Sequence, residues 1–462
     1  MTFSPTSRER RGLVLAVMCA GMFLVLLDVT IVNVALPAIA KDLHAPVAAL
    51  QWVVDGYVIA IAGLLLAAGT VGDHLGHRRL ALAGFALFGL ASLGCALAPD
   101  SGVLIAARIL QGIGGALLLP STMAVIVDVF PERTEQARAL GTWAAVSSLA
   151  LPAGPLLGGV LVQHFGWRPV FWIAVPLTIA AAAATYYIVP STAVRPGSRL
   201  DIRGLTAFVI GLAAAIFAVI SAGHHAGPRE VGVAALVAVC ALTAAFRSAR
   251  RAAHPFLPVD LLRRRQFLVP NIVAVLMNST FNGVLFVGTL YLQDTLGRTP
   301  SAAGLSVLPL AVPLVVLAPV SGRLTARFGP RPAVAAGCLA TLCGVLLLLT
   351  VGGMGWLLAA FTVLGCGGGL LTTAVVAATV RATPPERSGL ATGVSNTARQ
   401  VGTACGVAIF GAVAGEPSAP GFLSHIHLLA VGTAVVWVAA LVITLIAIEP
   451  VTAAAEPATA RR

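Results

Sequence analysis

The sequence predicts an all-α polytopic membrane protein with 14 transmembrane helices, arranged as two six-helix halves plus an inserted helix pair (6+2+6). Three observations lead to this prediction: the composition, a succession of apolar runs, and the alternation of basic segments between those runs. Of the 462 residues, 58% are hydrophobic and 10% are charged, and the mean hydropathy is +0.96. A soluble domain carries about 25% charged residues. The composition therefore predicts a chain that is surrounded mostly by lipid.

Fourteen apolar runs are each long enough to cross the hydrocarbon core of a bilayer, which takes about 17–25 residues of helix. The first run follows three arginines, as the apolar region of a signal peptide would, but it is too long for one and is predicted to be an uncleaved span. The runs lie at 13–37, 51–72, 80–98, 103–126, 139–162, 169–189, 204–223, 231–247, 269–292, 303–322, 333–352, 356–380, 390–414 and 427–448.

Basic residues alternate from one connecting segment to the next. With the N-terminus in the cytoplasm, 23 of the 29 Lys and Arg residues fall in segments predicted to be cytoplasmic, as the positive-inside rule requires. The outer segments contain only Lys41, Arg168, Arg229 and Arg298. This asymmetry predicts an even number of spans in the inner (cytoplasmic) membrane, with both termini cytoplasmic. It also explains the net charge of +12 without a nucleic-acid partner.

An internal repeat divides the chain. The segment Gly69–Arg79, between the second and third predicted spans, is similar to Gly322–Arg331, between the tenth and eleventh. A repeat at the same inner loop predicts two halves around a central cavity, as in an alternating-access transporter. The predicted divisions are a cytoplasmic N-terminus (1–12), an N-terminal six-helix half (13–189), a linker with two extra transmembrane helices (190–268), a C-terminal six-helix half (269–448) and a cytoplasmic tail (449–462).

Three charged residues inside the first half are candidates for proton coupling. Asp28 lies in the interior of the first span, Asp55 in the second and Arg108 in the fourth, and all three are predicted in the outer half of the membrane. A charge at this depth costs at least a few kcal/mol and is a functional candidate by default. A carboxylate whose arginine partner moves away can take up a proton. The alternative is a permanent ion pair that holds the first and fourth helices together.

The loop of the first half contains Gly69, Asp73, Gly76, Arg78 and Arg79. Its glycines allow close approach and a tight turn, and its carboxylate can pair with a helix terminus or a basic residue. A broken charge contact in this loop would separate the two halves, and the alternative is a well-packed turn with no switching role. The pattern resembles the signature of the major facilitator superfamily, although a histidine stands at position 77 where that family usually has arginine. The resemblance implies that the loop gates the two halves.

Two further motifs carry the resemblance. The stretch from Arg108 to Gly115 resembles a family motif whose arginine takes part in proton coupling. The fifth span contains Gly154, Pro155, Gly158 and Gly159, which resemble the motif associated with antiporters. Small residues there provide a flat face for packing, and the proline favours a bend. Ordinary small-residue packing is the alternative.

The segments Leu27–Pro37, Trp52–Tyr57 and Asn396–Gly402 are similar to the fourteen-helix drug:proton antiporters of the EmrB/QacA type, among which the methylenomycin-resistance type is similar as well. The resemblance covers nearly the whole chain. There are two departures: Ala174 stands where related sequences often have Asn, and the thirteenth predicted span has no carboxylate. The resemblance therefore does not extend to a preference for dicationic substrates.

Polar side chains in the spans are candidates for substrate binding. In the ninth span Asn271, Asn278, Asn282 and Thr289 share one helical face. The assigned candidates are Asn278 and Asn282 from this face, Arg399 in the thirteenth span and Asn33 in the first. The alternatives are hydrogen bonds between helices for the amides and contacts with backbone carbonyls for the arginine.

Together these observations predict proton-coupled efflux of a small, fairly apolar drug or antibiotic. The expected partners are the substrate, protons and the lipid bilayer, and the resemblance implies a monomer. No Walker-type loop is present, so the proton motive force is the expected energy source and no cofactor is expected. The seven cysteines lie in apolar segments without a C-x-x-C pair, which argues against a metal site.

The alternatives are a proton-coupled importer, or an exporter of a specific metabolite, on the same fold. A membrane enzyme or a sensor is the more distant possibility. We expect no enzyme, because no set of nucleophile and base is visible in the sequence.

Overall fold

The computed structural model describes residues 7–190, 201–223, 227–252, 259–350, 353–384, 388–417 and 421–449. These residues form helices joined by short connections, and no strand occurs among them. The helices are α1 (Ser7–Leu43), α2 (Val47–Leu75), α3 (His77–Ala96), α4 (Ser101–Val129), α5 (Arg133–Phe165), α6 (Pro169–Trp172), α7 (Ala174–Ile188), α8 (Ile202–Gly223), α9 (Pro228–Arg251), α10 (Val259–Leu262), α11 (Arg265–Leu290), the π-helix η1 (Tyr291–Thr295), α12 (Pro300–Phe328), α13 (Pro330–Leu347), the 3₁₀-helix η2 (Leu348–Thr350), α14 (Met354–Arg381), α15 (Ser388–Ala414) and α16 (Phe422–Ala447).

The predicted multi-pass membrane protein is confirmed at the level of its helices. Within the described residues, 12 helical segments are long and apolar enough to cross a membrane. Two other long helices, α5 with 33 residues and α15 with 27, coincide with the predicted spans at 139–162 and 390–414. α15 carries several polar side chains that face a cavity, and these lower its mean hydropathy.

The sixth predicted span, at 169–189, is broken into α6 and α7. Pro176 lies in the first turn of α7 and has no N–H to donate to the carbonyl of Trp172, four residues earlier. The chain therefore changes from one short helical turn to a second helix at Ile173.

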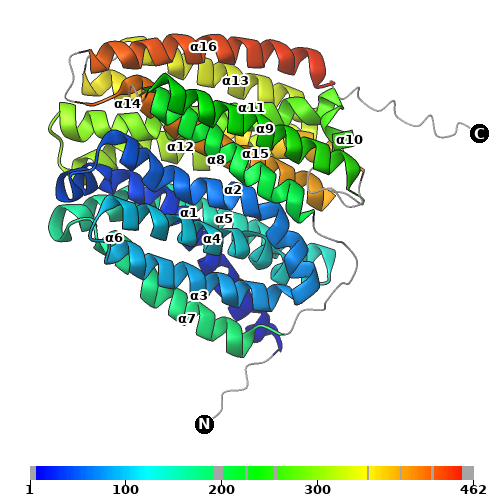
Figure 1. Cartoon of the computed structure of the whole chain (residues 1–462). Coiled ribbons are helices and arrows are strands. Elements are labelled where there is room, and N and C mark those ends of the chain that lie inside the picture. The colour runs from blue at the N-terminus through cyan, green and yellow to red at the C-terminus, as the bar shows by residue number, and fades with distance from the viewer. Residues whose placement is uncertain are drawn as a thin grey trace, which may run out of the picture.

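The helices form two bundles that lie against each other (Figure 1). The helices from α1 to α7 occupy the lower part of the view and those from α11 to α16 the upper part. In the first bundle α1 packs against α5, and α4 packs against both α2 and α3; in the second α11 packs against α15, and α14 against α12 and α13. The pair α8–α9 packs on the outside, where α8 contacts α2 from one bundle and α15 from the other.

The sequence repeat corresponds to two equivalent turns. Gly76 joins α2 to α3 with a φ of +90°, and Gly329 joins α12 to α13 with a φ of +81°. Glycine adopts this left-handed region at little cost, whereas a side chain there is strained. The second glycine of each repeat is therefore required by the same backbone geometry in both bundles.

Candidate functional site

A cavity of about 810 Å³ lies between the two bundles. It is lined by α1, α2, α4 and α5 on one side and by α11, α12, α14 and α15 on the other. Its volume lies within the range of about 300–1,000 Å³ that is usual for small-molecule sites. The cavity can therefore hold a drug-sized organic molecule.

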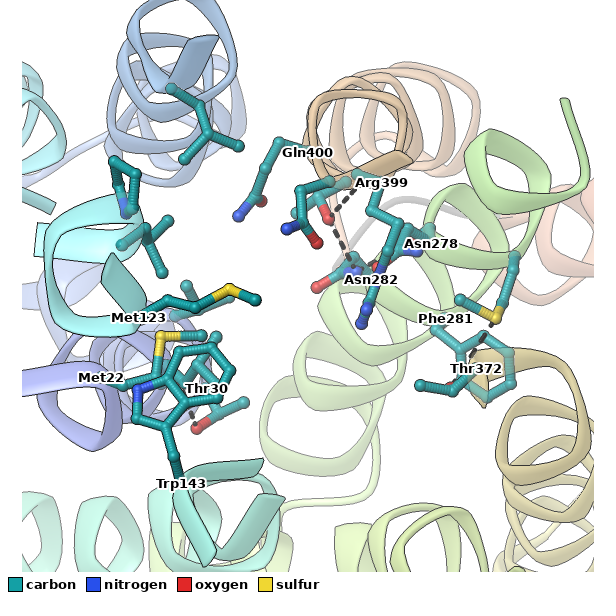
Figure 2. A pocket seen from close by; sticks show the side chains of 18 of the residues that line it. Met22, Thr30, Met123, Trp143, Asn278, Phe281, Asn282, Thr372, Arg399 and Gln400 are labelled. Carbon is teal, nitrogen blue, oxygen red and sulfur yellow. Dashed lines mark hydrogen bonds between the residues drawn. The ribbon is translucent and has the colours of Figure 1, made fainter. Parts of the chain in front are cut away.

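The wall from the first bundle is mostly apolar. Met22 from α1, Met123 from α4 and Trp143 from α5 lie together on this side, with Thr30 beside them (Figure 2). Thr30 donates a hydrogen bond to the carbonyl of Ala150 at 3.1 Å. The methionine side chains are flexible and adapt to apolar ligands of different shape.

The wall from the second bundle is polar. Asn278 and Asn282 from α11 face Arg399, Gln400 and Thr403 from α15 (Figure 2). The Nδ2 of Asn282 donates to the Thr403 hydroxyl at 3.2 Å, and that hydroxyl lies 3.2 Å from the carbonyl oxygen of Arg399. These bonds hold the polar groups of the two helices in one surface.

The arginine of this wall has no protein partner among the described residues. No hydrogen bond from the Arg399 guanidinium and no ion pair to it is found in the described ranges. Arg399 lines the cavity, and no contact of its guanidinium with a backbone carbonyl is found among the described residues. Its role in substrate binding stays a prediction.

The remaining polar residues predicted for this region lie elsewhere. Asn33 is 1% exposed, does not line the cavity, and donates its amide to the carbonyl of Val29 at 2.7 Å. Asn271 and Thr289 are buried and donate to carbonyls of their own helix. Of the predicted polar face of α11, the middle two asparagines reach the cavity.

Asp28 and Arg108 form a buried ion pair inside the first bundle. The guanidinium donates to one carboxylate oxygen of Asp28, to Oε1 of Gln111 at 2.6 Å and, through Nε, to the carbonyl of Val53 at 2.9 Å. Nε2 of Gln111 donates to the other carboxylate oxygen at 3.0 Å and to Ser92 at 2.9 Å. Both oxygens of the carboxylate therefore have a donor.

Aromatic rings cover this ion pair. The guanidinium carbon of Arg108 lies 4.2 Å from the ring centre of Tyr57 and 5.8 Å from that of Phe171. The Tyr57 hydroxyl donates to the carbonyl of Val25 at 3.0 Å. Sequence reasoning missed Tyr57 and Gln111 as site residues. The signal available for Gln111 was its place one turn after Arg108 on an apolar helix.

Helix α1 separates the ion pair from the cavity. Asp28 does not line the cavity, whereas Leu26, Val29 and Thr30 of the same helix do. One face of α1 thus carries the charge and the other faces the space where a ligand fits.

Asp55 is completely buried, and neither of its carboxylate oxygens has a hydrogen-bond partner among the described residues. Gln51, one turn earlier on α2, donates to the carbonyls of Val407 and Ala408 on α15 at 3.4 and 3.1 Å. Residues four apart share a helical face, so Asp55 lies on the face of α2 that packs against the second bundle.

The predicted gating loop is only partly described. Gly69 lines the cavity and Gly76 makes the turn. Arg78 donates to the carbonyl of Tyr186 at 2.5 Å, and Arg79 is exposed. The side chain of Asp73 lies outside the described residues.

The predicted antiporter motif lies where α5 crosses α1 and α12. Gly154 and Gly158 face Thr30 and Ile31 of α1. A Cβ at Gly159 would lie 2.8 Å from the Cα of Ser301. On the facing helix α12, Gly304 packs against the carbonyl of Pro155. The motif therefore brings the two bundles close together at this crossing.

Further contacts join the two bundles at the end of the molecule where α5 crosses α12. Nε2 of Gln293 donates to the carbonyl of Val34 at 3.0 Å, and Lys41 lies 3.9 Å from Asp294. Together with the bonds of Gln51 and the glycine contacts of α5, they form a contact surface between the bundles, which is named the outer seal after the side of the membrane on which the sequence predicts it. The cavity instead reaches the opposite helix ends, at Gly69 and Asp128. The bundles are therefore in contact at one end, and the cavity extends toward the other end.

Comparison with known proteins gives a consistent result. The family profile described as Major Facilitator Superfamily matches residues 18–407 and 271–461. The chain is 36% identical over 429 residues to the methylenomycin A resistance protein of Streptomyces coelicolor, which covers 92% of this chain and 90% of that protein. It is 35% identical over 410 residues to the tetracenomycin C resistance and export protein of Streptomyces glaucescens, covering 87% and 76%. It is 33% identical over 401 residues to the multidrug resistance protein Stp of Mycobacterium tuberculosis, covering 85% and 74%.

Solved structures show the same fold at low sequence identity. The transporter PepTSo of the POT family superposes with a TM-score of 0.68 at 14% identity, covering 96% of this chain and 98% of that chain. A peptide transporter POT in complex with sulfate superposes with a TM-score of 0.70 at 13% identity, covering 96% and 99%. At this identity the likeness concerns the fold alone.

Proposed function

The chain belongs to the major facilitator superfamily, and we propose that it exports small drug-like or antibiotic molecules across the cytoplasmic membrane in exchange for protons. The observation that carries the proposal is the arrangement of α1, with the buried Asp28–Arg108 pair on one face and a drug-sized cavity on the other. The relatives named as resistance and export proteins support the same function.

The proposed topology has 14 transmembrane helices in a 6+2+6 arrangement, with both termini in the cytoplasm. The 12 apolar segments together with the long helices α5 and α15 support this number. The alternation of basic segments supports the orientation. The halves are 13–189 and 269–448, and the inserted pair is α8–α9. In this orientation the cavity opens to the cytoplasm and the outer seal closes the far side.

The proposed cycle uses the ion pair as a proton switch. In the structure Asp28 holds Arg108 on α4 and thereby fixes α1. Protonation of Asp28 removes the charge that pairs with Arg108 and weakens the packing of α1 on α4. The opposite face of α1 moves with it, which changes the cavity and the outer seal. Substrate release and proton uptake are then linked through one helix.

The proton motive force supplies energy of the same size as the cost of this switch. One pH unit supplies about 1.4 kcal/mol per proton, and 100 mV supplies about 2.3 kcal/mol per charge. The sum is close to the cost of about 3–5 kcal/mol for separating a buried ion pair. The protein acts as a transporter without a cofactor in this proposal, and it functions as a monomer.

Three further roles belong to the proposal. Asp55, which packs toward α15, is a second proton site at the contact between the bundles. The loop with Asp73, Arg78 and Arg79 gates the cytoplasmic side. The Gly-Pro motif of α5 provides the flat surface on which the outer seal forms and separates.

A susceptibility panel tests the proposal. A drug-sensitive host is compared with the same host making the wild-type protein, Asp28→Asn or Asp42→Asn. Asp42 is the matched control because it is an exposed carboxylate at the end of the same helix, paired with Arg168. We expect the wild type and Asp42→Asn to raise the inhibitory concentration of at least one compound, and Asp28→Asn to lose this protection at equal protein level. Protection by Asp28→Asn equal to that of the wild type contradicts the proton switch.

A further inference from the structure

Arg399 stands out among the charged groups at mid-depth. It lies 11 residues into the 27-residue helix α15, about 17 Å from its start. A guanidinium at this depth is costly unless it meets water, a counter-ion or a ligand. A functional partner is therefore expected for it.

The surroundings of Arg399 differ from those of Arg108. Arg108 is covered by two aromatic rings, and it donates to a carboxylate, an amide and a backbone carbonyl. For Arg399, no accepting atom is found within the described part of the chain. Its donors line the cavity, where a ligand can reach them.

The groups around Arg399 favour an oxyanion. A guanidinium binds a carboxylate through two parallel hydrogen bonds, a geometry that an ammonium cannot offer. Asn278, Asn282 and Gln400 lie on the same wall (Figure 2) and supply neutral amide groups. The acidic residue among the described lining residues is Asp128, the penultimate residue of α4, at the open end of the cavity. The deep part of this wall therefore has positive charge without a fixed negative charge beside it.

The facing wall selects for an apolar body. Met22, Met123 and Trp143 lie across the cavity from Arg399 (Figure 2). A ligand that places a charge on one wall must place its remaining surface on the other. The two thioethers and the indole carry no charge and accept apolar bodies of varied shape.

We propose that the cavity binds amphipathic organic anions, with the acidic group on Arg399 and the apolar body against Met22, Met123 and Trp143. This inference rests on the proposed export function and names the substrate class of the same cavity. Cationic compounds are disfavoured in the deep part of the cavity, because the Arg399 guanidinium repels their charge there and the carboxylate of Asp128 lies at the open end.

A matched set of three probes tests the substrate class: naphthalene carrying an acetate, an acetamide or an ethylammonium group. Their apolar bodies are the same, and their charges at pH 7 are negative, zero and positive. The dissociation constant of each is measured by titration calorimetry with the purified full-length protein, without a proton gradient. We expect the acetate to bind at least about tenfold more tightly than the acetamide, which corresponds to about 1.4 kcal/mol, and the ammonium to bind most weakly.

Three variants locate the site. Arg399→Gln should abolish the preference for the acetate, and Arg399→Lys should retain part of it because the charge remains. Arg298→Gln is the control, since Arg298 is exposed and does not line the cavity; it should bind like the wild type. If no Arg399 variant can be purified, the order of the three dissociation constants for the wild type decides whether the cavity prefers anions.

The proposal is overturned by three results: the acetamide or the ammonium binding as tightly as the acetate, Arg399→Gln keeping the wild-type preference, or the acetate not binding at all. Each of these leaves proton-driven export intact, because binding is measured without a gradient. Conversely, a protein that prefers the acetate but protects no host against any compound contradicts the export function and not the anion site.

Discussion

Replacing Arg108 by glutamine removes the centre of the buried network in the first bundle. The guanidinium donates to Asp28, to Gln111 at 2.6 Å and to the carbonyl of Val53 at 2.9 Å. The side chain of Arg108 is 1% exposed and that of Asp28 is 6% exposed, so water does not take over the lost bonds. In Arg108→Gln the buried carboxylate keeps Gln111 as its donor among the described residues.

The expected loss of stability follows from this burial. Removing one partner of a buried ion pair costs about 3–5 kcal/mol, and Asp28→Asn, which leaves the buried Arg108 without its counter-ion, should cost a similar amount. The double variant has two amides that can bond to each other, and we expect it to lie within about 2 kcal/mol of the wild type, because no buried charge remains. The two single losses sum to at least about 6 kcal/mol, so the coupling free energy is at least about 4 kcal/mol, well above the ~0.5 kcal/mol of independent sites.

The assay combines stability with transport. The four proteins of the cycle are purified in mild detergent and unfolded with increasing mole fractions of SDS, followed by tryptophan fluorescence. We expect the double variant to regain most of the stability but not proton-driven transport. If the two single changes add within ~0.5 kcal/mol, the pair is not the coupled unit that the structure indicates. If the stable double variant still exports against a gradient, the pair is purely structural.

Three other substitutions have definite expectations. Gly304→Val places a side chain against the carbonyl of Pro155 and should open the outer seal; cysteine labelling at the outer seal should increase and transport should fall at least about tenfold, and unchanged labelling would contradict this. Asp55→Asn should keep the unfolding midpoint, because no described group donates to the carboxylate, and should slow transport; equal transport would remove Asp55 from the proton pathway. Trp437→Phe loses the 2.9 Å bond from Nε1 to Thr280 and should cost about 1 kcal/mol of stability without changing transport; a change in substrate affinity would argue against this purely structural role.

The positions of the helices follow from the sequence because length and hydropathy determine them. The 14 predicted runs each fall on a long helix or, at 169–189, on a broken one. The break at Ile173 depends on one proline near a helix start, and hydropathy does not register such a position. The number and orientation of the membrane spans also depend on the surrounding lipid, which is not part of the hydropathy pattern or of the helix packing.

The sequence predicted those residues of the candidate site that carry a charge inside an apolar helix. Asp28, Arg108 and Arg399 are conspicuous because charges are rare in apolar helices, and the structure places the first two in contact and the third on the cavity. Asn33 was not predictable in this way, because an asparagine can bond to its own helix, as it does with Val29. Which face of a helix meets a cavity depends on the packing of all its neighbours.

The roles of Gln111, Ser92 and Tyr57 could not be read from the sequence for the same reason. They come from three helices and meet only when α2, α3 and α4 pack together. Polar residues of this kind are common in membrane helices, where they bond between helices. Their place around the ion pair is a property of the tertiary structure.

Transport into everted membrane vesicles tests proton-coupled export most directly. A compound identified by the susceptibility panel is added outside vesicles whose interior is acidified, and its accumulation is followed over time. We predict that wild-type and Asp42→Asn vesicles accumulate the compound, that a protonophore abolishes the accumulation, and that Asp28→Asn vesicles do not accumulate it. Accumulation that persists without the gradient, or that Asp28→Asn supports as well as the wild type does, would contradict the account.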